Sequence, residues 1–212
     1  MDRRMDVWWI ASQRCLFGNA CADPVVTGYS SPTKAFMNTN VDEKLALIFG
    51  RRSIRLYSPA AVSEAAVQKL LEAAMAAPSA AAKDPWRFVV VRDRQTLSAI
   101  SAALPNGQMI AGAALGIAVC GDLQAAHDQQ LSYLLQDCSA AIENLLLCAH
   151  VLGLGACWLG VHPREQMVNS LKQILSLPVS VVPVACIAIG HPAEAKEPRT
   201  RFNRGYVHLE RW

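Results

Sequence analysis

Apolar residues recur with two different periods after Met37, and the two periods alternate along the chain. A spacing of three and four residues predicts helices at 41–49, 63–77, 95–104, 131–152 and 163–175, with Ser63 as the cap of the second. Short runs rich in β-branched residues predict strands at 87–92, 115–120, 156–161 and 181–189. Helices and strands mixed in this way predict an α+β fold, in which a sheet packs between helices.

Residues 1–36 follow neither period. They hold Trp8, Trp9, two cysteines and scattered Gly and Pro. We therefore expect an atypical, poorly ordered stretch at 1–36, either a true extension or the product of an upstream start codon, and one folded domain at 37–212.

The expected helix at 131–152 is apolar on nearly all sides. It also carries Gln136, Asp137, Glu143 and Asn144, which favours a core or interface helix over a membrane span. Only 17% of the residues are charged and 52% are hydrophobic, so part of the surface is expected to be hidden in a homodimer.

Charge and cysteine content exclude several classes of function. A net charge of +3, with no basic stripe interleaved with aromatics, argues against a nucleic-acid-binding protein. The seven cysteines are odd in number and form no C-x-x-C pair, so neither a disulfide framework nor a zinc or iron–sulfur site is expected. Buried reduced thiols in a cytoplasmic protein without a metal are the simplest interpretation.

The run Arg51-Arg52-Ser53-Ile54-Arg55 concentrates three guanidinium groups and a hydroxyl in five residues. Guanidinium groups match phosphate oxygens in charge and in bidentate geometry. In an extended segment Arg51, Ser53 and Arg55 would point to one side and form a compact phosphate pocket. A solvated basic turn is the alternative.

Three further motifs follow in order. A loop of small residues, Ala77 to Ala82, leads through Pro85-Trp86 into a strand, and small side chains let backbone amides approach a planar ligand. A strand rich in small and apolar residues runs from Gly155 to Gly160. Basic residues, among them Lys196 in a charged turn expected to be exposed, come directly after the last strand. Each motif alone also fits an ordinary connection or core strand.

In this order and at these separations, the four motifs resemble the nitroreductase family of flavin mononucleotide (FMN) enzymes. The resemblance covers residues 41–212. It implies a mostly antiparallel sheet between helices and an intertwined homodimer with flavin sites at the subunit interface. The helix at 131–152 then resembles the one that forms the dimer core.

The resemblance also implies site residues. The basic run would bind the phosphate and flavin edge, a loop from the partner subunit would complete the site, a backbone segment would lie beside the reactive ring face, and a C-terminal arginine would close on the phosphate. The matching positions are Arg51, Arg52, Ser53 and Arg55 for the run; Pro78, Ser79 and Ala80 for the loop; Leu159 and Gly160 for the segment; and Arg201, less surely Arg199, for the last.

The implied activity is a ping-pong cycle in which NADH or NADPH reduces the flavin and an electron-poor small molecule, a nitroaromatic, quinone or enone, then takes the electrons. The cofactor carries this chemistry, so no catalytic side chain is assigned. His162 and His191 are expected near the site, His150 in a core or interface, and Cys157 as a small buried residue beside the flavin segment.

One departure from the family pattern leaves alternatives open. The family loop usually reads Pro-Ser-Ala-x-Asn-x-Gln-Pro-Trp, whereas here Ala82 and Asp84 replace the Asn and the Gln. An alanine cannot offer the side-chain hydrogen bond that this Asn commonly makes to the flavin. A flavin-binding redox sensor or carrier without turnover, and a specialised relative such as a reductive dehalogenase or flavin-destroying enzyme, are therefore the rival functions.

Overall fold

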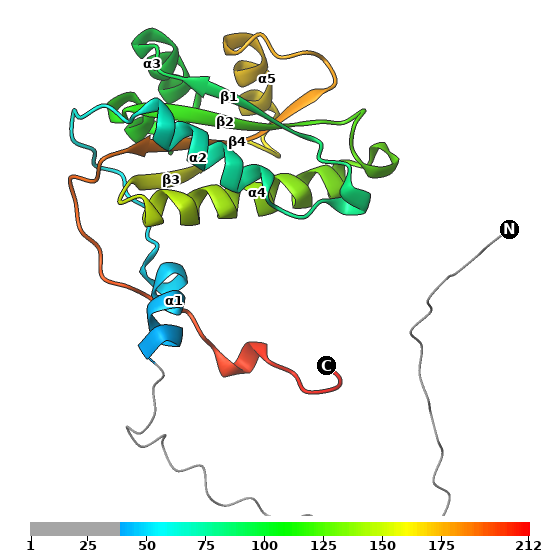
Figure 1. Cartoon of the computed structure of the whole chain (residues 1–212). Coiled ribbons are helices and arrows are strands. Elements are labelled where there is room, and N and C mark those ends of the chain that lie inside the picture. The colour runs from blue at the N-terminus through cyan, green and yellow to red at the C-terminus, as the bar shows by residue number, and fades with distance from the viewer. Residues whose placement is uncertain (1–38) are drawn as a thin grey trace, which may run out of the picture. The chain divides into compact units, whose positions relative to one another are not determined.

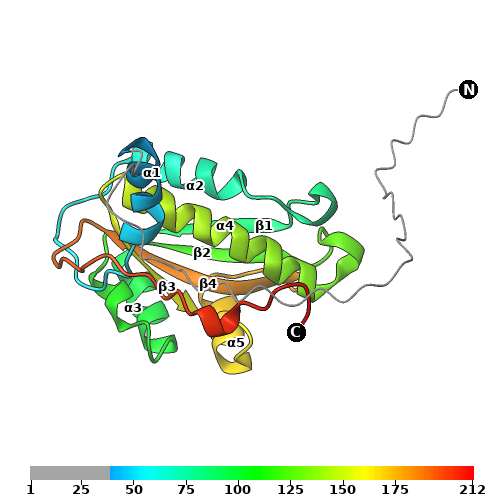
Figure 2. The same ribbon diagram turned by 90° about the horizontal axis from the view of Figure 1, so that it is seen from below.

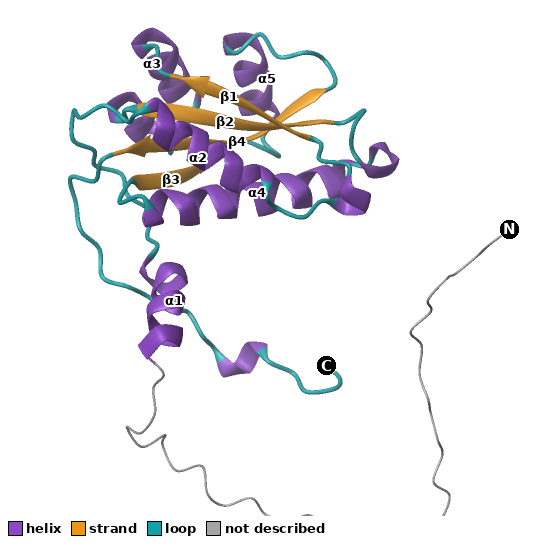
Figure 3. Ribbon diagram, in the orientation of Figure 1, coloured by secondary structure: helices purple, strands orange, loops and turns teal. Residues whose placement is uncertain are grey.

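The computed structural model describes residues 39–212. Apart from short 3₁₀ turns, these residues form five helices and four strands (Figure 3), namely α1 (Thr39–Gly50), α2 (Glu64–Met75), β1 (Trp86–Val91), α3 (Arg94–Ala103), β2 (Leu115–Asp122), α4 (Leu131–Val151), β3 (Gly155–Gly160), α5 (Glu165–Ile174) and β4 (Val181–Gly190). Each of the nine predicted elements is present within two residues of its expected bounds. The stretch expected at 1–36 lies outside the described residues, so its nature stays a prediction.

The four strands form one antiparallel sheet in the order β1-β2-β4-β3. The central strands β2 and β4 are buried along nearly their whole length, because helices cover both faces. Figures 1 and 2 show α2 and α4 side by side on one face, while α3 and α5 lie on the other. The predicted α+β fold, a mostly antiparallel sheet between helices, is confirmed.

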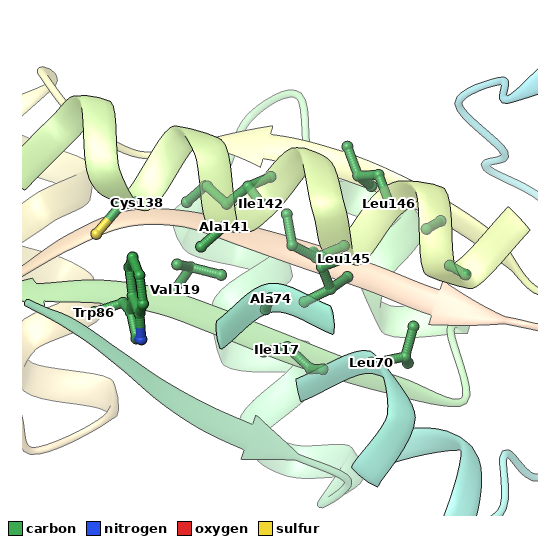
Figure 4. Packing of buried hydrophobic residues seen from close by; sticks show 14 of the residues in the cluster. Leu70, Ala74, Trp86, Ile117, Val119, Cys138, Ala141, Ile142, Leu145 and Leu146 are labelled. Atoms are coloured by element: carbon green, nitrogen blue, oxygen red, sulfur yellow. The ribbon is translucent and has the colours of Figure 1, made fainter. Parts of the chain in front are cut away.

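The larger core lies between the sheet and the pair α2 and α4. Figure 4 shows Leu70 of α2, Ile142 and Leu145 of α4 and Ile117 of β2 in this core, and all four are fully buried. Each such side chain stabilises the fold by roughly 1.5–3 kcal/mol. Eight residues of α4 are already buried within one chain. Its apolarity therefore reflects intrachain packing to a larger degree than the sequence suggested.

The smaller core lies on the other face of the sheet. Leu97 and Ile100 of α3 and Leu171 of α5 are buried there against Ala118 of β2 and Cys186 of β4. Small residues on this side of the strands let the two short helices approach closely. This core fixes the positions of the loop after α3 and of the start of α5, which both reach the candidate site described below.

Side-chain caps set where two helices begin. The Oγ of Ser63 accepts a hydrogen bond from the backbone N of Ala66 at 3.2 Å, which confirms Ser63 as the cap of α2. Asp93 does the same for α3, accepting from the backbone N of Thr96 at 2.7 Å. A cap of this kind contributes about 1 kcal/mol.

Two segments carry most of the exposed large apolar side chains. In Figure 1, α1 (blue) and the C-terminal segment (red) stand away from the sheet, and the backbone N of Arg199 donates to the carbonyl oxygen of Phe49 at 3.1 Å. Neither segment buries its apolar side chains in this chain. The exposed residues are Val41, Leu45, Leu47, Ile48 and Phe49 in α1, and Phe202, Tyr206, Val207, Leu209 and Trp212 in the C-terminal segment.

The five cysteines among residues 39–212 are free thiols, and four of them are buried. Burial raises the pKa of Cys120 and of Cys138 to about 12, so both thiols stay protonated at neutral pH. Cys15 and Cys21 lie outside the described residues. The expected burial is confirmed for four of the five described cysteines, whereas Cys148 is only partly buried. Their reduced state stays a prediction.

Candidate active site

The Arg51–Arg55 run lies between the edge strand β3 and the segment that follows β4. Ser53 forms a parallel bridge with Ala156 of β3, and the backbone N of Ile54 donates to the carbonyl oxygen of Ala156 at 3.0 Å. Farther on, the backbone N of Ser58 donates to the carbonyl oxygen of His191 at 2.9 Å. The run is therefore anchored on both sides by main-chain hydrogen bonds.

Glu194 and Lys196 hold the backbone of this run in place. Glu194 Oε1 accepts a hydrogen bond from the backbone N of Arg55 at 2.5 Å. Lys196 Nζ donates to the carbonyl oxygen of Ser53 at 2.8 Å and lies 3.0 Å from Glu194 Oε1. The hydrogen bond from Arg55 N, followed by the one from Lys196, lowers the pKa of Glu194. The expectation that Lys196 sits in an exposed turn is wrong, since its side chain is only 25% exposed.

The guanidinium groups of the run face two different hollows. Arg51 Nε lies 3.3 Å from Glu143 Oε1 of α4, and Arg52 Nη1 donates to the carbonyl oxygen of Glu197. Arg51 and Arg52 line a hollow of about 310 Å³, which we call the Arg51 hollow. Arg55 lines a second one of about 400 Å³. Within one chain, Arg51 and Arg55 therefore line different hollows, because the run is a bridged loop rather than a strand.

The second hollow, here called the Gly160 hollow, lies where β3 ends. Leu159 and Gly160 line it together with Arg55, the loop after α3 and the start of α5. Leu159 is buried, whereas Gly160 is exposed, and a Cβ added at Gly160 would meet no atom within 4 Å. The end of the strand therefore leaves open space in front of the Gly160 backbone.

Two other predicted residues also line the Gly160 hollow, His162 and Cys157. Burial raises the pKa of the Cys157 thiol, against the lowering effect of Arg55. A protonated thiol is a poor nucleophile, which agrees with a packing role for Cys157. His191 lies elsewhere, with its Nε2 3.3 Å from the carbonyl oxygen of Ala61. His150 lines the Arg51 hollow.

The loop Pro78–Ala80 is fixed from within the chain but contributes to neither hollow. Ser79 Oγ donates to Asp84 Oδ1 at 2.5 Å and accepts from the backbone N of Asp84 at 3.0 Å. The backbone N of Ala80 donates to Asp137 Oδ1 of α4 at 2.9 Å. Within one chain, the loop and the Arg51–Arg55 run are thus separate features, so a single site would need loop and run from different subunits.

Arg199 and Arg201 lie in the exposed C-terminal segment. The backbone of Arg199 is held by Phe49 of α1, but neither side chain lines a described hollow. Within one chain, Arg55, Leu159 and Gly160 therefore line the Gly160 hollow, whereas Arg51 and Arg52 line the Arg51 hollow. Arg199 and Arg201 are not brought to either group.

Sequence reasoning missed residues that hold the site and residues that line it. Asp137 was visible as a carboxylate in an otherwise apolar helix, and Glu194 as an acid beside the basic C-terminal motif. Asn106 and Arg164, which line the Gly160 hollow, carried no signal, because their loops acquire a shared position only through the fold.

The comparisons with known proteins identify the family. The model of the nitroreductase family matches residues 48–191, most of the chain that holds the two hollows. The chain belongs to the nitroreductase family. The resemblance drawn from the four motifs is confirmed.

Individual nitroreductase relatives cover the same region. A protein of Archaeoglobus fulgidus, named for NADH dehydrogenase and NAD(P)H nitroreductase activity, is 42% identical over 81% of this chain and 100% of its own length. A structure from Bacteroides thetaiotaomicron with the same name is 34% identical and has a TM-score of 0.76, covering 84% of this chain and 100% of that chain. A nitroreductase from Desulfovibrio desulfuricans, solved in complex with FMN, is 35% identical with a TM-score of 0.69, covering 79% and 96%.

The described residues hold neither a membrane-spanning helix nor a metal-binding cluster. None of the helices in residues 39–212 is both long enough and apolar enough to cross a membrane. In the same residues, no three His, Cys, Asp or Glu side chains are grouped so that they could hold a metal ion.

Proposed function

We propose that this nitroreductase-family protein is an FMN-dependent NAD(P)H oxidoreductase that passes electrons to an electron-poor small molecule. The observation that carries the proposal is the open space in front of the Gly160 backbone, in a hollow that the cationic residue Arg55 also lines. The FMN in the Desulfovibrio desulfuricans structure and the NAD(P)H in the name of the Archaeoglobus fulgidus relative support it. Nitroaromatics, quinones and enones are the proposed acceptors.

Residues of both hollows would hold the flavin. Leu159 and Gly160 would lie against the ring, and Arg55 would contact the edge of the ring. Arg51, Arg52 and Ser53 would bind the phosphate, where guanidinium groups make strong charge-assisted hydrogen bonds. The partner subunit would complete the site with its loop residues Pro78, Ser79 and Ala80. At the C-terminal end, Arg201 and Arg199 would close on the phosphate.

The bound flavin would supply the redox chemistry, taking a hydride from NAD(P)H and later giving two electrons to the acceptor. For a quinone, the sum is NAD(P)H, one proton and quinone giving NAD(P)⁺ and hydroquinone, so two electrons and two protons reach the acceptor. The chain's own residues bind and orient the ligands. An open Gly160 hollow would let donor and acceptor use the same place in turn, as a ping-pong cycle requires.

We further propose that the protein works as an intertwined homodimer in the cytoplasm, where NAD(P)H is supplied and thiols stay reduced. The exposed apolar side chains of α1 and of the C-terminal segment would be covered by a second copy of the chain. The separation of the Pro78–Ala80 loop from the basic run within one chain supports a site built from two copies. A stable monomer that retains flavin in sedimentation at micromolar concentration would contradict this.

A flavin-binding redox sensor or carrier without turnover is the second candidate, and Ala82 in place of the family Asn is the observation that favours it. Steady-state oxidation of NADH and NADPH, measured with menadione and with a nitrofuran, separates the two. Sustained turnover with either acceptor supports the oxidoreductase. Flavin that is reduced once, without multiple turnovers on any acceptor, supports the sensor or carrier.

A further inference from the structure

The Gly160 hollow is lined by positive and neutral polar groups without a carboxylate. Of the described residues that line it, Arg55 and Arg164 are cationic, Asn106 and His162 are polar, and none is Asp or Glu. The thiol of Cys157 adds no negative charge, since burial keeps it protonated. The carboxylate of Glu194 lies beside the backbone N of Arg55 at 2.5 Å but pairs with Lys196, so the lining of the hollow itself carries a net positive charge.

Arg164 differs from most arginines of the folded domain in having no side-chain partner among residues 39–212. Between residues 51 and 191, five arginines pair with a carboxylate or donate to a backbone carbonyl, namely Arg51, Arg52, Arg87, Arg92 and Arg94. The two exceptions in that range are Arg55 and Arg164, and both line the Gly160 hollow. Two guanidinium groups without a protein partner at one hollow indicate a site for an anionic group.

The backbone of Arg164 is fixed although its side chain is free. Its N–H donates to the carbonyl oxygen of Val161 at 3.1 Å, and its own carbonyl accepts from the N–H of Val168 at 3.0 Å, at the first turn of α5. Helix α5 is in turn buried through Leu171. The exposed side chain of Arg164 is thus attached to a rigid part of the backbone, at the edge of the hollow.

The rest of the hollow suits a small ring. Leu159 is assigned to the flavin under the proposed function, so Leu104 and Met167 provide the apolar surface left for a second ligand. The hollow's volume of about 400 Å³, within the range of roughly 300–1,000 Å³ of small-molecule sites, would be shared with the flavin ring. Arg55 is already assigned to the flavin under the proposed function. Arg164 has no such assignment, so it remains available for the second ligand.

We propose that the electron acceptor carries a carboxylate or a comparable anionic group beside its reducible group, and that Arg164 binds this anionic group. The inference rests on the proposed function, because it assigns the Gly160 hollow to the acceptor. Arg164 would then favour anionic electron-poor acceptors over neutral acceptors of equal size. Arg164 is a specificity residue and takes no part in electron transfer.

The test compares two ligands that differ in charge but little in size, 4-nitrobenzoate and 4-nitrobenzyl alcohol. Their binding to the purified flavin-loaded protein is measured by isothermal titration calorimetry, for the wild type and for Arg164→Gln. The wild type is expected to bind 4-nitrobenzoate at least about tenfold more tightly, the effect of one charge-assisted contact. Arg164→Gln should remove this preference and leave the binding of the alcohol unchanged.

Two further variants serve as controls. Lys69→Gln removes one positive charge from the exposed face of α2, where Lys69 pairs with Glu72 at 2.8 Å, and should keep the preference. Arg164→Lys retains the positive charge and should therefore retain part of the preference for 4-nitrobenzoate. In steady-state assays, Arg164→Gln should raise the KM for 4-nitrobenzoate and leave kcat unchanged.

Three results would overturn the inference. The first is equal affinity of the wild type for the two ligands. The second is a preference that Lys69→Gln abolishes as fully as Arg164→Gln does, which would reveal a general charge effect. The third is an Arg164→Gln variant impaired only in its KM for NADPH relative to NADH, which would place the 2′-phosphate of the donor at Arg164. A protein that oxidises no NAD(P)H would instead contradict the proposed function.

Discussion

Asp137 of α4 holds the backbone of Ala80, because its Oδ1 accepts the hydrogen bond from the Ala80 N–H at 2.9 Å. Asp137 is only 5% exposed, and its Oδ2 is buried without a partner among the residues that the structure describes. A buried, half-satisfied carboxylate is costly, and a fold keeps one where it fixes something of use. Here it fixes the loop proposed to contact the flavin of the partner subunit.

Replacing Asp137 should therefore weaken FMN binding from a distance. Asp137→Ala leaves the Ala80 N–H without its acceptor, and a hydrogen bond of about 1 kcal/mol corresponds to roughly fivefold in the dissociation constant. Asn144→Ala is the matched control, since Asn144 Nδ2 of the same helix donates to the carbonyl oxygen of Ala73 in α2 at 3.2 Å. Titration of the apo-protein with FMN, followed by fluorescence quenching, measures both. Equal losses in the two variants would show that Asp137 acts only on stability.

The family Asn, when restored at position 82, should stabilise the loop. Ala82 has φ of 51°, and Ala81 and Asp84 also lie in the left-handed region. This conformation costs an L-residue roughly 1–2 kcal/mol, and Asn tolerates it better than Ala. Ala82→Asn should thus raise the thermal midpoint slightly and tighten FMN binding by a few-fold, whereas Ala82→Val should lower the midpoint. Weaker FMN binding in a stabilised Ala82→Asn would show that the loop does not approach the flavin.

Because the space in front of Gly160 is open, a substitution there can affect cofactor binding without affecting folding. Gly160→Ala should leave the thermal midpoint of the apo-protein unchanged, because its methyl group meets no protein atom within 4 Å. The same methyl group would intrude on a ring packed against the strand, so FMN binding should weaken at least about tenfold, as overpacking by one methyl costs roughly 1–3 kcal/mol. Gly112→Ala, at another glycine with open space, should change neither quantity. A Gly160→Ala variant that binds FMN as the wild type does would place the ring elsewhere.

Glu194 should make the Arg51–Arg55 run sensitive to acid. Its pKa is lowered in the folded state, so its stabilising contribution is complete above the ordinary carboxyl value of about 4.3 and is lost as the pH falls through the lowered pKa. Glu194→Gln should be less stable than the wild type at pH 7, and the difference in thermal midpoint should close below about pH 4. A constant difference from pH 7 to pH 3 would mean that the charge of Glu194 does not hold the run.

The sequence predicted the elements well because periodicity reports burial directly. Leu70, Ile117 and Leu145, for example, lie in elements that the spacing predicts, and all three are fully buried. Periodicity predicted the candidate site less well than it predicted the elements. Alternation placed Arg51 and Arg55 in one pocket, but Glu143 pairs with Arg51 across 92 residues of chain, and the run is not a strand.

Contacts between segments distant in sequence leave no local pattern. Lys196 contacts Ser53 through a fold that brings the end of the chain back to β3, and a charged turn in the sequence says nothing of this. Asp137 was conspicuous by its polarity, yet its partner Ala80 could not be inferred from spacing. Motif order therefore identified the family, whereas the support of the site required the structure.

The flavin content of the purified protein tests the central claim most directly. Its absorption spectrum, followed by heat release and identification of the chromophore by mass, measures how much FMN each chain holds. We expect one non-covalent FMN per chain in a dimer. A protein that absorbs only through its aromatic residues, and that takes up no FMN when titrated with it, would contradict the account.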